Sequence, residues 1–291
     1  MPELPDLAVV SDALHAALTG RSIVRAEAPA PLAVRGTPAE LAALVGQRLR
    51  HVTRRGKFVL FELDRDRIAV NAMLTGRFQL AAPGDKQPPN TAVILGFGPR
   101  TAGPRDAAKW TKGAAWLPSN DASAEIRYRD PSQMGEVYLL PAGVSRPVTG
   151  LEDGDQGPDA DSLALTLDVW RERIRRHPGE LKSLLRNQAF VAGIGNAYSD
   201  EILHAAKLSP FRKRSSLAPE EVDALYEATR STLGNAIEVL RERVPPTFER
   251  QVRDFLAVHR KGGEPCPRCG TRLSKVSSRS EATTWCRGCQ R

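Results

Sequence analysis

Four cysteines, all within the last 26 residues, constrain the fold of this chain more than any other feature. Cys266, Cys269, Cys286 and Cys289 follow the spacing C-x2-C-x16-C-x2-C. Two thiolate pairs of this kind complete a tetrahedral zinc site, and four protein ligands leave no open position for catalysis. Two disulfides are the alternative, but a cytosolic chain with no other cysteine disfavours them. We therefore expect one structural Zn²⁺ that holds a small C-terminal hairpin together.

Positive charge is concentrated in the same part of the chain. Residues 249–291 contain ten basic and four acidic side chains and contribute most of the net charge of +8. Such a tail suits a polyanionic partner, most simply nucleic acid, although a merely soluble basic tail would have the same composition. No apolar run approaches the length of a membrane span, and the start lacks the layout of a signal peptide. We expect a cytoplasmic protein with no membrane partner.

Hydrophobic periodicity divides the chain into a strand-rich part and a helical part. A helix over 6–19 precedes short alternating segments between 22 and 140, which predict strands. Residues 98–121 are rich in Gly and Pro and predict a long surface loop that exposes Trp110 and Trp116. After a linker at 141–161, the apolar spacing becomes helical up to Pro245.

A glycine-containing turn lies between two of these predicted helices. Gly193 and Gly195 lack the preceding strand and third glycine of a dinucleotide fingerprint. The next helix is expected to begin near Asn196, where its free N–H groups would attract an anion. The turn predicts either a phosphate-binding site or a helix hairpin that needs glycine for packing.

The first residues, "MPEL", raise a chemical possibility. Removal of Met1 would leave Pro2 as a secondary amine, and free α-amino groups titrate near pH 8, so part of the population is a neutral nucleophile. Attack on a sugar C1′ would expel a base and leave an iminium ion, which acidifies the adjacent carbon and promotes β-elimination of the 3′ phosphate. Glu3 is placed to carry protons for these steps. An ordinary frayed terminus is the alternative.

Four segments together resemble the formamidopyrimidine-DNA glycosylase / endonuclease VIII family: "MPELPD" at 1–6, "RRGKFVLFEL" at 54–63, "GIGNAYSDEIL" at 193–203 and the cysteine region at 262–290. The resemblance implies an α+β multidomain fold. It would comprise an N-terminal β-sandwich with flanking helices over 1–145, a helix-two-turn-helix DNA-binding domain over 160–247 and a C-terminal zinc finger over 248–291. It also implies a monomeric, nucleoid-associated bacterial enzyme of base excision repair that acts on damaged double-stranded DNA.

The same resemblance assigns roles to individual residues. It implies a bifunctional DNA glycosylase and abasic-site lyase with Pro2 as nucleophile, Glu3 as general acid and base, and Lys57 as the hairpin lysine near the lesion. Asn196 and the Gly193–Gly195 turn would hold backbone phosphates. Whether β-elimination continues to δ-elimination is left open.

The chain departs from the family pattern where residues enter the duplex. Leu74 occupies the position of the family's usual inserting residue. Ser132 stands where the family has the arginine that reads the orphaned cytosine, and Met134 stands where it has the wedge phenylalanine. Met134 can fill a gap but has no ring to stack. We expect Leu74, Gln133 and Met134 to enter the duplex with altered discrimination of the opposite base, which favours a pyrimidine-acting or otherwise atypical member.

The zinc finger departs from the pattern as well. The phosphate-gripping arginine of the family aligns with Glu281, and Arg279 two residues earlier is the candidate to replace it. These changes keep two alternatives open: a damaged-DNA-binding protein that has kept the fold without excising bases, and a plain zinc-ribbon regulatory protein.

Overall fold

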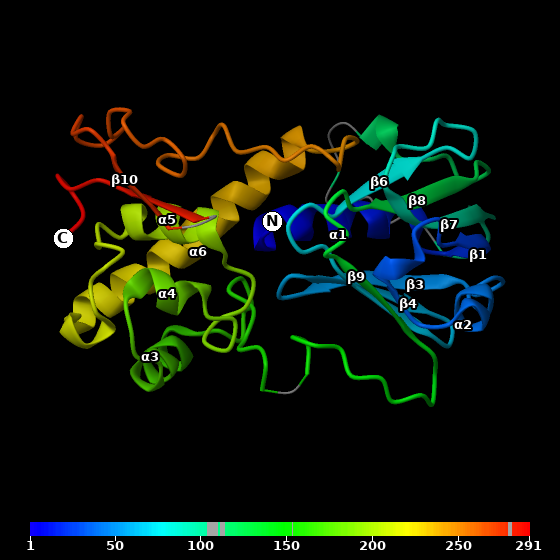
Figure 1. The fold of residues 1–291 in the computed structure, drawn as a ribbon, viewed down its shortest axis with the longest axis horizontal. Helices are drawn as coiled ribbons and strands as arrows, with labels where there is room; N and C mark the ends of the chain where they lie inside the picture. The colour runs from blue at the N-terminus through cyan, green and yellow to red at the C-terminus, as the bar shows by residue number, and fades with distance from the viewer. Residues whose placement is uncertain (104–109, 111–113, 153, 279–280) are drawn as a thin grey trace. The chain divides into compact units, whose positions relative to one another are not determined.

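A computed structural model describes residues 1–103, 110, 114–152, 154–278 and 281–291. The chain forms two compact units (Figure 1). The first contains Met1–Pro2, Asp6–Thr149 and Leu240–Gln251, and the second contains Glu3–Pro5, Gly150–Val239 and Val252–Arg291. The first helix and the longest helix, α1 (Leu4–Leu18) and α6 (Pro219–Arg243), therefore each contribute residues to both units.

Two sheets form the first unit. The four-stranded sheet has the order β1-β7-β8-β6, with strands β1 (Arg21–Glu27), β6 (Arg77–Ala81), β7 (Thr91–Arg100) and β8 (Ala124–Arg129). The five-stranded sheet has the order β2-β9-β5-β4-β3, with strands β2 (Val34–Arg35), β3 (Leu49–Arg55), β4 (Phe58–Leu63), β5 (Arg67–Asn71) and β9 (Glu136–Leu140). A short helix, α2 (Pro38–Ala42), follows β2 and begins at a capping box between Thr37 and Glu40.

Apolar side chains from the two sheets meet face to face. Phe61 of β4 and Phe78 of β6 have ring centroids 6.0 Å apart, and Phe78 also contacts Tyr128 of β8 at 5.5 Å. All three rings are buried. Burial of one face of each sheet is what the alternating sequence pattern predicts, so the expected β-sandwich is confirmed.

The two tryptophans of the 98–121 segment do not match the expectation of exposure. Trp110 is only 4% exposed, and its ring packs edge-to-face on that of Trp116 with centroids 5.3 Å apart. Trp116 in turn contacts Phe248, at 5.8 Å. The prediction was wrong because the local Gly and Pro content says nothing about distant aromatic partners, which give these rings apolar surface to cover.

Helices build the second unit around Trp170, which is fully buried against Phe190 and Tyr226. They are α3 (Leu167–Arg176), α4 (Leu181–Arg186), α5 (Asn196–Ala205) and most of α6. Thr166 caps α3 by accepting a hydrogen bond from the Val169 N–H. A two-stranded hairpin of β10 (Ser274–Ser278) and β11 (Glu281–Trp285) follows near the C-terminus.

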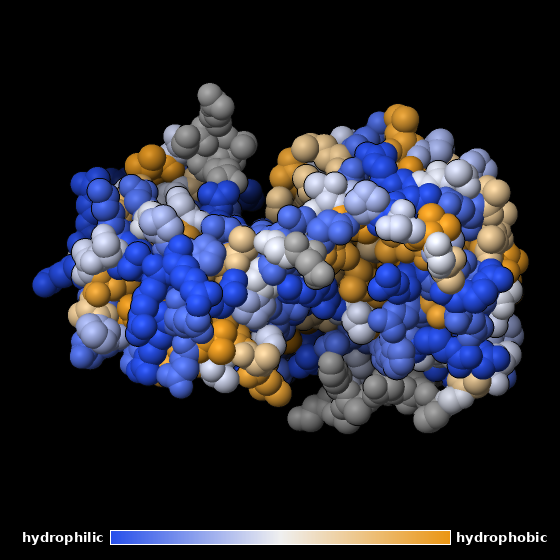
Figure 2. Space-filling model, turned by 90° about the horizontal axis from the view of Figure 1, so that it is seen from below, coloured by the Kyte–Doolittle hydropathy of each residue, from blue (hydrophilic) through white to orange (hydrophobic). Residues whose placement is uncertain are grey.

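The surface agrees with the charged composition of the chain. On the face drawn in Figure 2, hydrophilic residues predominate and hydrophobic ones are scattered between them. Within the described residues, no helix combines the length and the apolar character that crossing a bilayer requires.

Candidate active site and zinc centre

Pro2 lies at the edge of a mostly apolar pocket in the first unit. The N-terminal turns of α1, the start of β6 with the turn before it, and the segment after α6 form the walls. The lining residues are Pro2, Asp6, Leu7, Val10, Ala72, Gly76, Arg77, Phe78, Val244, Phe248, Arg250 and Gln251. Mostly apolar walls with a few polar side chains are the usual composition of a small-molecule site.

The Gln251 side chain forms a hydrogen bond with the first residue of the chain. The Gln251 Nε2 donates to the carbonyl oxygen of Met1 at 3.3 Å, and Arg77 donates to the Gln251 Oε1 at 3.5 Å. Removal of Met1 would convert the Pro2 nitrogen from an amide to an amine and would also release this Gln251 donor. Both changes would take place at the mouth of the same pocket.

Glu3 is buried in the second unit, where its carboxylate meets the N-terminal end of α5. It accepts hydrogen bonds from the backbone N–H groups of Gly195 at 2.7 Å, Ala197 at 2.8 Å and Tyr198 at 3.2 Å. These are N–H groups that a helix leaves without an intrahelical partner, and the helix dipole favours a negative charge there. Glu3 is thus fixed in one orientation immediately after Pro2 in the chain.

The two glycines of the turn are explained by this approach of the N-terminal residues. A Cβ at Gly195 would lie 2.5 Å from the Glu3 Cδ, and one at Gly193, where φ is +99°, would lie 2.7 Å from the Leu4 Cβ. The Gly193 N–H donates to the Gln188 side chain, as the Gly195 N–H does to Glu3. Both N–H groups therefore already have partners within the chain, and the predicted contact of this turn with backbone phosphates stays a prediction. The anion at this helix terminus is the Glu3 carboxylate.

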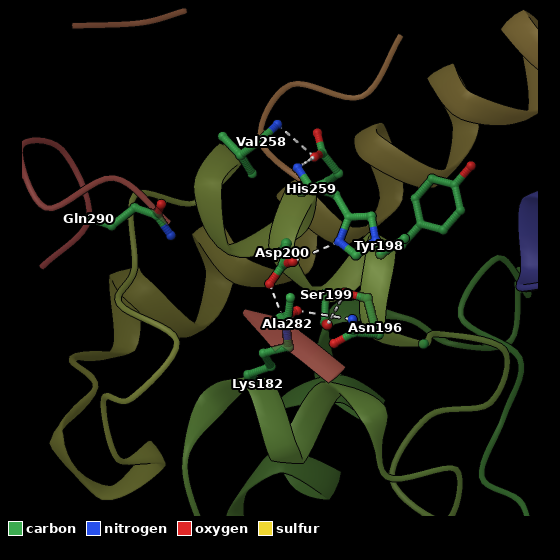
Figure 3. Close-up of polar contacts among 12 residues, drawn as sticks. Lys182, Asn196, Tyr198, Ser199, Asp200, Val258, His259, Ala282 and Gln290 are labelled. Atoms are coloured by element: carbon green, nitrogen blue, oxygen red, sulfur yellow. Dashed lines mark hydrogen bonds and ion pairs between the residues drawn. The ribbon is translucent and has the colours of Figure 1, made fainter. Parts of the chain in front are cut away.

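Asn196 connects α5 to the C-terminal hairpin, and a buried ion pair connects α5 to α4 (Figure 3). The Asn196 Nδ2 donates to the Ala282 carbonyl of β11 at 3.0 Å. Lys182 lies 2.5 Å from Asp200, which also contacts the His259 Nδ1 at 2.8 Å. In the described residues the buried Oδ1 of Asn196 has no hydrogen-bond partner. The predicted role of Asn196 toward DNA stays a prediction, and the sequence analysis did not identify Lys182.

Glu201 fixes the segment that leads from the helices to the zinc region. Its carboxylate accepts three backbone hydrogen bonds, from Ala257 at 2.7 Å, Val258 at 2.8 Å and His259 at 2.7 Å. No motif in the sequence had singled out Glu201 either. The available signal was the pair of adjacent acids, Asp200 and Glu201, in a helix that buries almost all of its residues.

The four cysteines come together as predicted. Their Sγ atoms all lie within 4.8 Å of one another, with Cys269 and Cys286 at 3.4 Å and Cys266 and Cys289 at 3.9 Å. Tetrahedral zinc with bonds of about 2.3 Å places its sulfurs roughly 3.8 Å apart, so these residues fit the metal. Hydrogen bonds from Thr271 lower the pKa of the Cys269 thiol to about 6, which favours a thiolate.

Residues of the helical unit support the cysteine cluster. The His204 Nε2 of α5 lies 3.3 Å from the Cys266 Sγ. Burial and the nearby Arg268 guanidinium lower the pKa of His204 to about 4, so its ring is neutral near pH 7. The Gln290 side chain accepts from the Cys286 N–H at 2.7 Å and donates to the Leu208 carbonyl at 2.9 Å. The cluster is thereby attached to the helices at two points.

Lys57 lies at the tip of the hairpin between β3 and β4. It is half-buried and follows Gly56, which has a φ of +55° in the two-residue turn. A positive φ at this position favours glycine. The turn therefore fixes where the lysine leaves the hairpin.

The residues expected to enter the duplex are on two neighbouring turns. Leu74 and Met134 are 44% and 48% exposed, which is unusual for large apolar side chains, and Gln133 has a φ of +55°. Both turns attach to the buried Asp130. Its Oδ2 accepts from the Gly135 N–H at 2.6 Å, while its Oδ1 accepts from Ser132 and Thr75 side chains. The hydrogen bonds of Asp130 thus fix the backbone of the two turns that carry Leu74 and Met134.

The candidate DNA-contacting residue Arg279 lies outside the described residues, so its role stays a prediction.

Three family models match successive parts of the chain. The formamidopyrimidine-DNA glycosylase N-terminal domain matches residues 1–137, its H2TH domain matches 156–244, and the zinc finger found in FPG and IleRS matches 263–291. The matches follow one another in the order that the sequence analysis expected.

Relatives match over the full length. The formamidopyrimidine-DNA glycosylase of Geobacillus kaustophilus is 32% identical and covers 100% of both chains. That of Symbiobacterium thermophilum is also 32% identical, over 100% of this chain and 89% of its own. Among solved structures, the Lactococcus lactis Fpg bound to DNA containing N7-benzyl-Fapy-dG superposes with a TM-score of 0.82 at 24% identity, covering 100% of both chains. A Lactococcus lactis Fpg complex with abasic-site DNA has a TM-score of 0.80 at 23% identity and covers 99% of both.

Proposed function

Because this chain belongs to the formamidopyrimidine-DNA glycosylase family, we propose that it excises damaged bases from double-stranded DNA and then cleaves the abasic strand. The observation that carries the proposal is the arrangement of its first residues. Pro2 borders a pocket with apolar walls, and Glu3, next in the chain, is fixed by three backbone hydrogen bonds. A nucleophile and a proton carrier with defined positions are what a covalent glycosylase needs.

The first covalent step joins the enzyme to the sugar. The lone pair of the mature Pro2 nitrogen attacks C1′, the N-glycosidic bond breaks, and its electron pair leaves with the base, which takes up a proton. The ring oxygen of the sugar is protonated as the ring opens, giving an iminium ion between Pro2 and C1′. Glu3 is the group that transfers these protons.

Strand cleavage follows from the charge on that iminium ion. Since a secondary amine has no second proton to lose, the cation withdraws electrons from C2′ and makes its proton acidic. Loss of this proton forms the C2′–C3′ double bond and expels the 3′ phosphate. Water then hydrolyses the iminium ion, which releases the sugar fragment and regenerates Pro2.

The remaining predicted residues have roles in holding DNA. We propose that Lys57 orients phosphate and sugar near the lesion, that Asn196 and Arg279 contact backbone phosphates, and that Leu74, Gln133 and Met134 occupy the space left by the flipped base. The four cysteines would hold one zinc ion, which would cross-link the hairpin and have no part in the reaction. The enzyme would act as a monomer on DNA in the cytoplasm, with affinity that falls as salt rises.

Borohydride trapping tests the proposal. Protein whose mass shows complete removal of Met1 is mixed with duplex DNA containing one abasic site and reduced. We expect a covalent adduct with the unaltered chain and none with Pro2→Gly, whose primary amine has a different position and nucleophilicity. Pro29→Gly serves as the matched control, because Pro29 lies in an exposed segment of the first unit and should leave the adduct unchanged.

The alternative is a damaged-DNA-binding protein that does not excise. The altered wedge residues Leu74 and Met134, and Glu281 in the zinc hairpin, motivate it. Absence of any adduct from correctly processed protein that still binds abasic DNA would favour this alternative.

A further inference from the structure

The 98–121 segment is fastened at its base to the C-terminal end of α1. The fully buried Arg21 guanidinium donates to the Ala17 carbonyl of α1 at 3.0 Å, to the Gly98 carbonyl at 3.0 Å and to the Ser119 carbonyl at 2.7 Å. Arg100 adds a hydrogen bond to the Ala16 carbonyl at 3.0 Å. Both ends of the segment are therefore held close to the C-terminal end of α1, through Arg21 at the start of β1 and through Arg100.

The aromatic residues of the segment make contacts on the chain that follows α6. Trp116 meets Phe248 edge-to-face, with an angle of 76° between the rings and 5.8 Å between their centroids. The Trp110 ring packs edge-to-face against that of Trp116, and the Arg241 guanidinium lies 6.0 Å from the Trp110 ring centroid. Phe248 is only 3% exposed as a result of these contacts and of its contribution to the core.

Phe248 is also a wall of the pocket at Pro2. The pocket has a cavity volume of about 30 Å³. An apolar cavity that accommodates benzene measures about 150 Å³, so a base can enter only if a wall moves. Residues 244–251 belong to no helix or strand, whereas the other walls are formed by α1 and by β6 with its preceding turn. Because it lies outside regular secondary structure, the wall that contains Phe248 is the one able to move, and Trp116 packs against Phe248.

We propose that Trp116 is a positioning residue that limits how far Phe248 can move, and that the Pro2 pocket therefore favours single-ring damaged bases over two-ring ones. This inference rests on the proposed glycosylase function. Trp116 is absent from the pocket lining, so it acts through Phe248 and not by touching the base. Trp116 would thus set the base preference of the pocket without lining it.

The test compares excision of thymine glycol with excision of 8-oxoguanine, each in the same duplex, by the Trp116→Ala variant. We expect the ratio of kcat/KM for the two-ring base to that for the single-ring base to rise about tenfold, since contacts worth one or a few methylene groups discriminate by about 10- to 200-fold. Trp116→Phe keeps an aromatic edge against Phe248 and should restore the original ratio. Ala115→Ser, at the exposed neighbouring position, should leave it unchanged.

Cleavage of a preformed abasic site separates this inference from the proposed function, because that substrate has no base to admit. Trp116→Ala should retain abasic-site cleavage while its base preference shifts; an unchanged ratio with intact cleavage overturns the inference. If Trp116→Ala loses cleavage through misfolding, Phe248→Leu opens the same wall directly, and an unchanged ratio in that variant overturns the inference equally. Loss of both activities in the unaltered chain would instead contradict the proposed function.

Discussion

The Glu3 carboxylate and the backbone N–H of Gly195 form a 2.7 Å hydrogen bond across 192 residues of sequence. This contact joins the N-terminal motif to the glycine turn of the helical unit. It explains why residue 195 must lack a side chain, since a Cβ there would overlap the carboxylate that it is meant to hold. Position 195 therefore requires glycine because the Glu3 side chain occupies the space that a Cβ would need.

Gly195→Ala should displace Glu3 and lower base excision by at least about 100-fold, the lower range expected when a general acid or base is lost. A new Cβ 2.5 Å from the Glu3 Cδ also predicts a loss of stability of about 1–3 kcal/mol from overpacking. Single-turnover excision and thermal unfolding measure the two effects.

Gly234→Ala is the control for this substitution. Gly234 lies within α6 and a Cβ there would meet nothing within 4 Å, so the change should keep activity and stabilise the helix by up to about 1 kcal/mol. Full excision activity in Gly195→Ala would contradict the positioning of Glu3 described above.

How much of this could be predicted from sequence depended on whether each residue's partner lies nearby in the chain. The cysteine cluster was predicted because two C-x2-C pairs contain their own geometry, and the strands were predicted because alternation reports burial residue by residue, whereas their arrangement as a sandwich was implied only by the family resemblance. Trp110 was mistaken for an exposed residue because one of its partners, the Arg241 guanidinium, lies more than a hundred residues away in the chain, and its ring partner Trp116 in turn packs on the equally distant Phe248.

The same limit applies to the candidate site. Gly195 suggested a free helix N-terminus, but its anionic partner is supplied by Glu3 at the other end of the chain. Lys182 and His204 had no motif that distinguished them from surface residues of amphipathic helices. Their partners, Asp200 and Cys266, became visible only once the helices and the hairpin were in place.

Lys182→Met should strongly destabilise the second unit. Lys182 and Asp200 form a buried ion pair of 2.5 Å, with side chains 7% and 0% exposed. Removing Lys182 takes away the cationic partner of the buried Asp200 carboxylate and leaves it only its contact with His259, and breaking such a pair typically costs about 3–5 kcal/mol. Calorimetric unfolding of the zinc-loaded protein provides the measurement.

A second substitution provides the control for that prediction. Asp200→Asn in the Lys182→Met background removes the uncompensated charge while keeping a side chain that can hydrogen-bond His259. We expect the double variant to recover at least about 1 kcal/mol. A single variant that unfolds like the unaltered chain would show that the ion pair adds nothing to the stability of this unit.

His204→Phe should weaken zinc binding about tenfold or more. A neutral imidazole 3.3 Å from the Cys266 Sγ can donate its Nε2 proton to the thiolate, and loss of a hydrogen bond to a metal ligand typically costs 10- to 100-fold in affinity. Competition with a chromophoric chelator measures the change. His51→Phe, at an exposed position in the first unit, should retain the original affinity, and equal affinities in all three proteins would exclude a role for His204.

Asp130→Asn should loosen the turns that present Leu74 and Met134, and the effect should depend on pH. Burial alone would raise the pKa of Asp130, but hydrogen bonds from Thr75, Gly135 and Ser132 outweigh it and hold the pKa below 3.8. The carboxylate therefore stabilises the fold fully above pH 3.8, and this contribution is lost as the pH falls through the lower pKa of the folded state. At pH 7 we expect a destabilisation of about 1.5–3 kcal/mol, the usual worth of hydrogen bonds to a charged group.

The unaltered chain and Asp130→Asn should consequently differ in melting temperature at pH 7 and converge only once the pH has fallen below the lowered pKa of Asp130 in the folded state, where both side chains are neutral. Because every other carboxylate titrates in both proteins, the difference between the two melting curves isolates Asp130. Hydrogen exchange should rise at the Ser132 and Gly135 N–H groups, which donate to this carboxylate. A difference that persists undiminished at acid pH would mean that the shape of the side chain, and not its charge, holds the two turns.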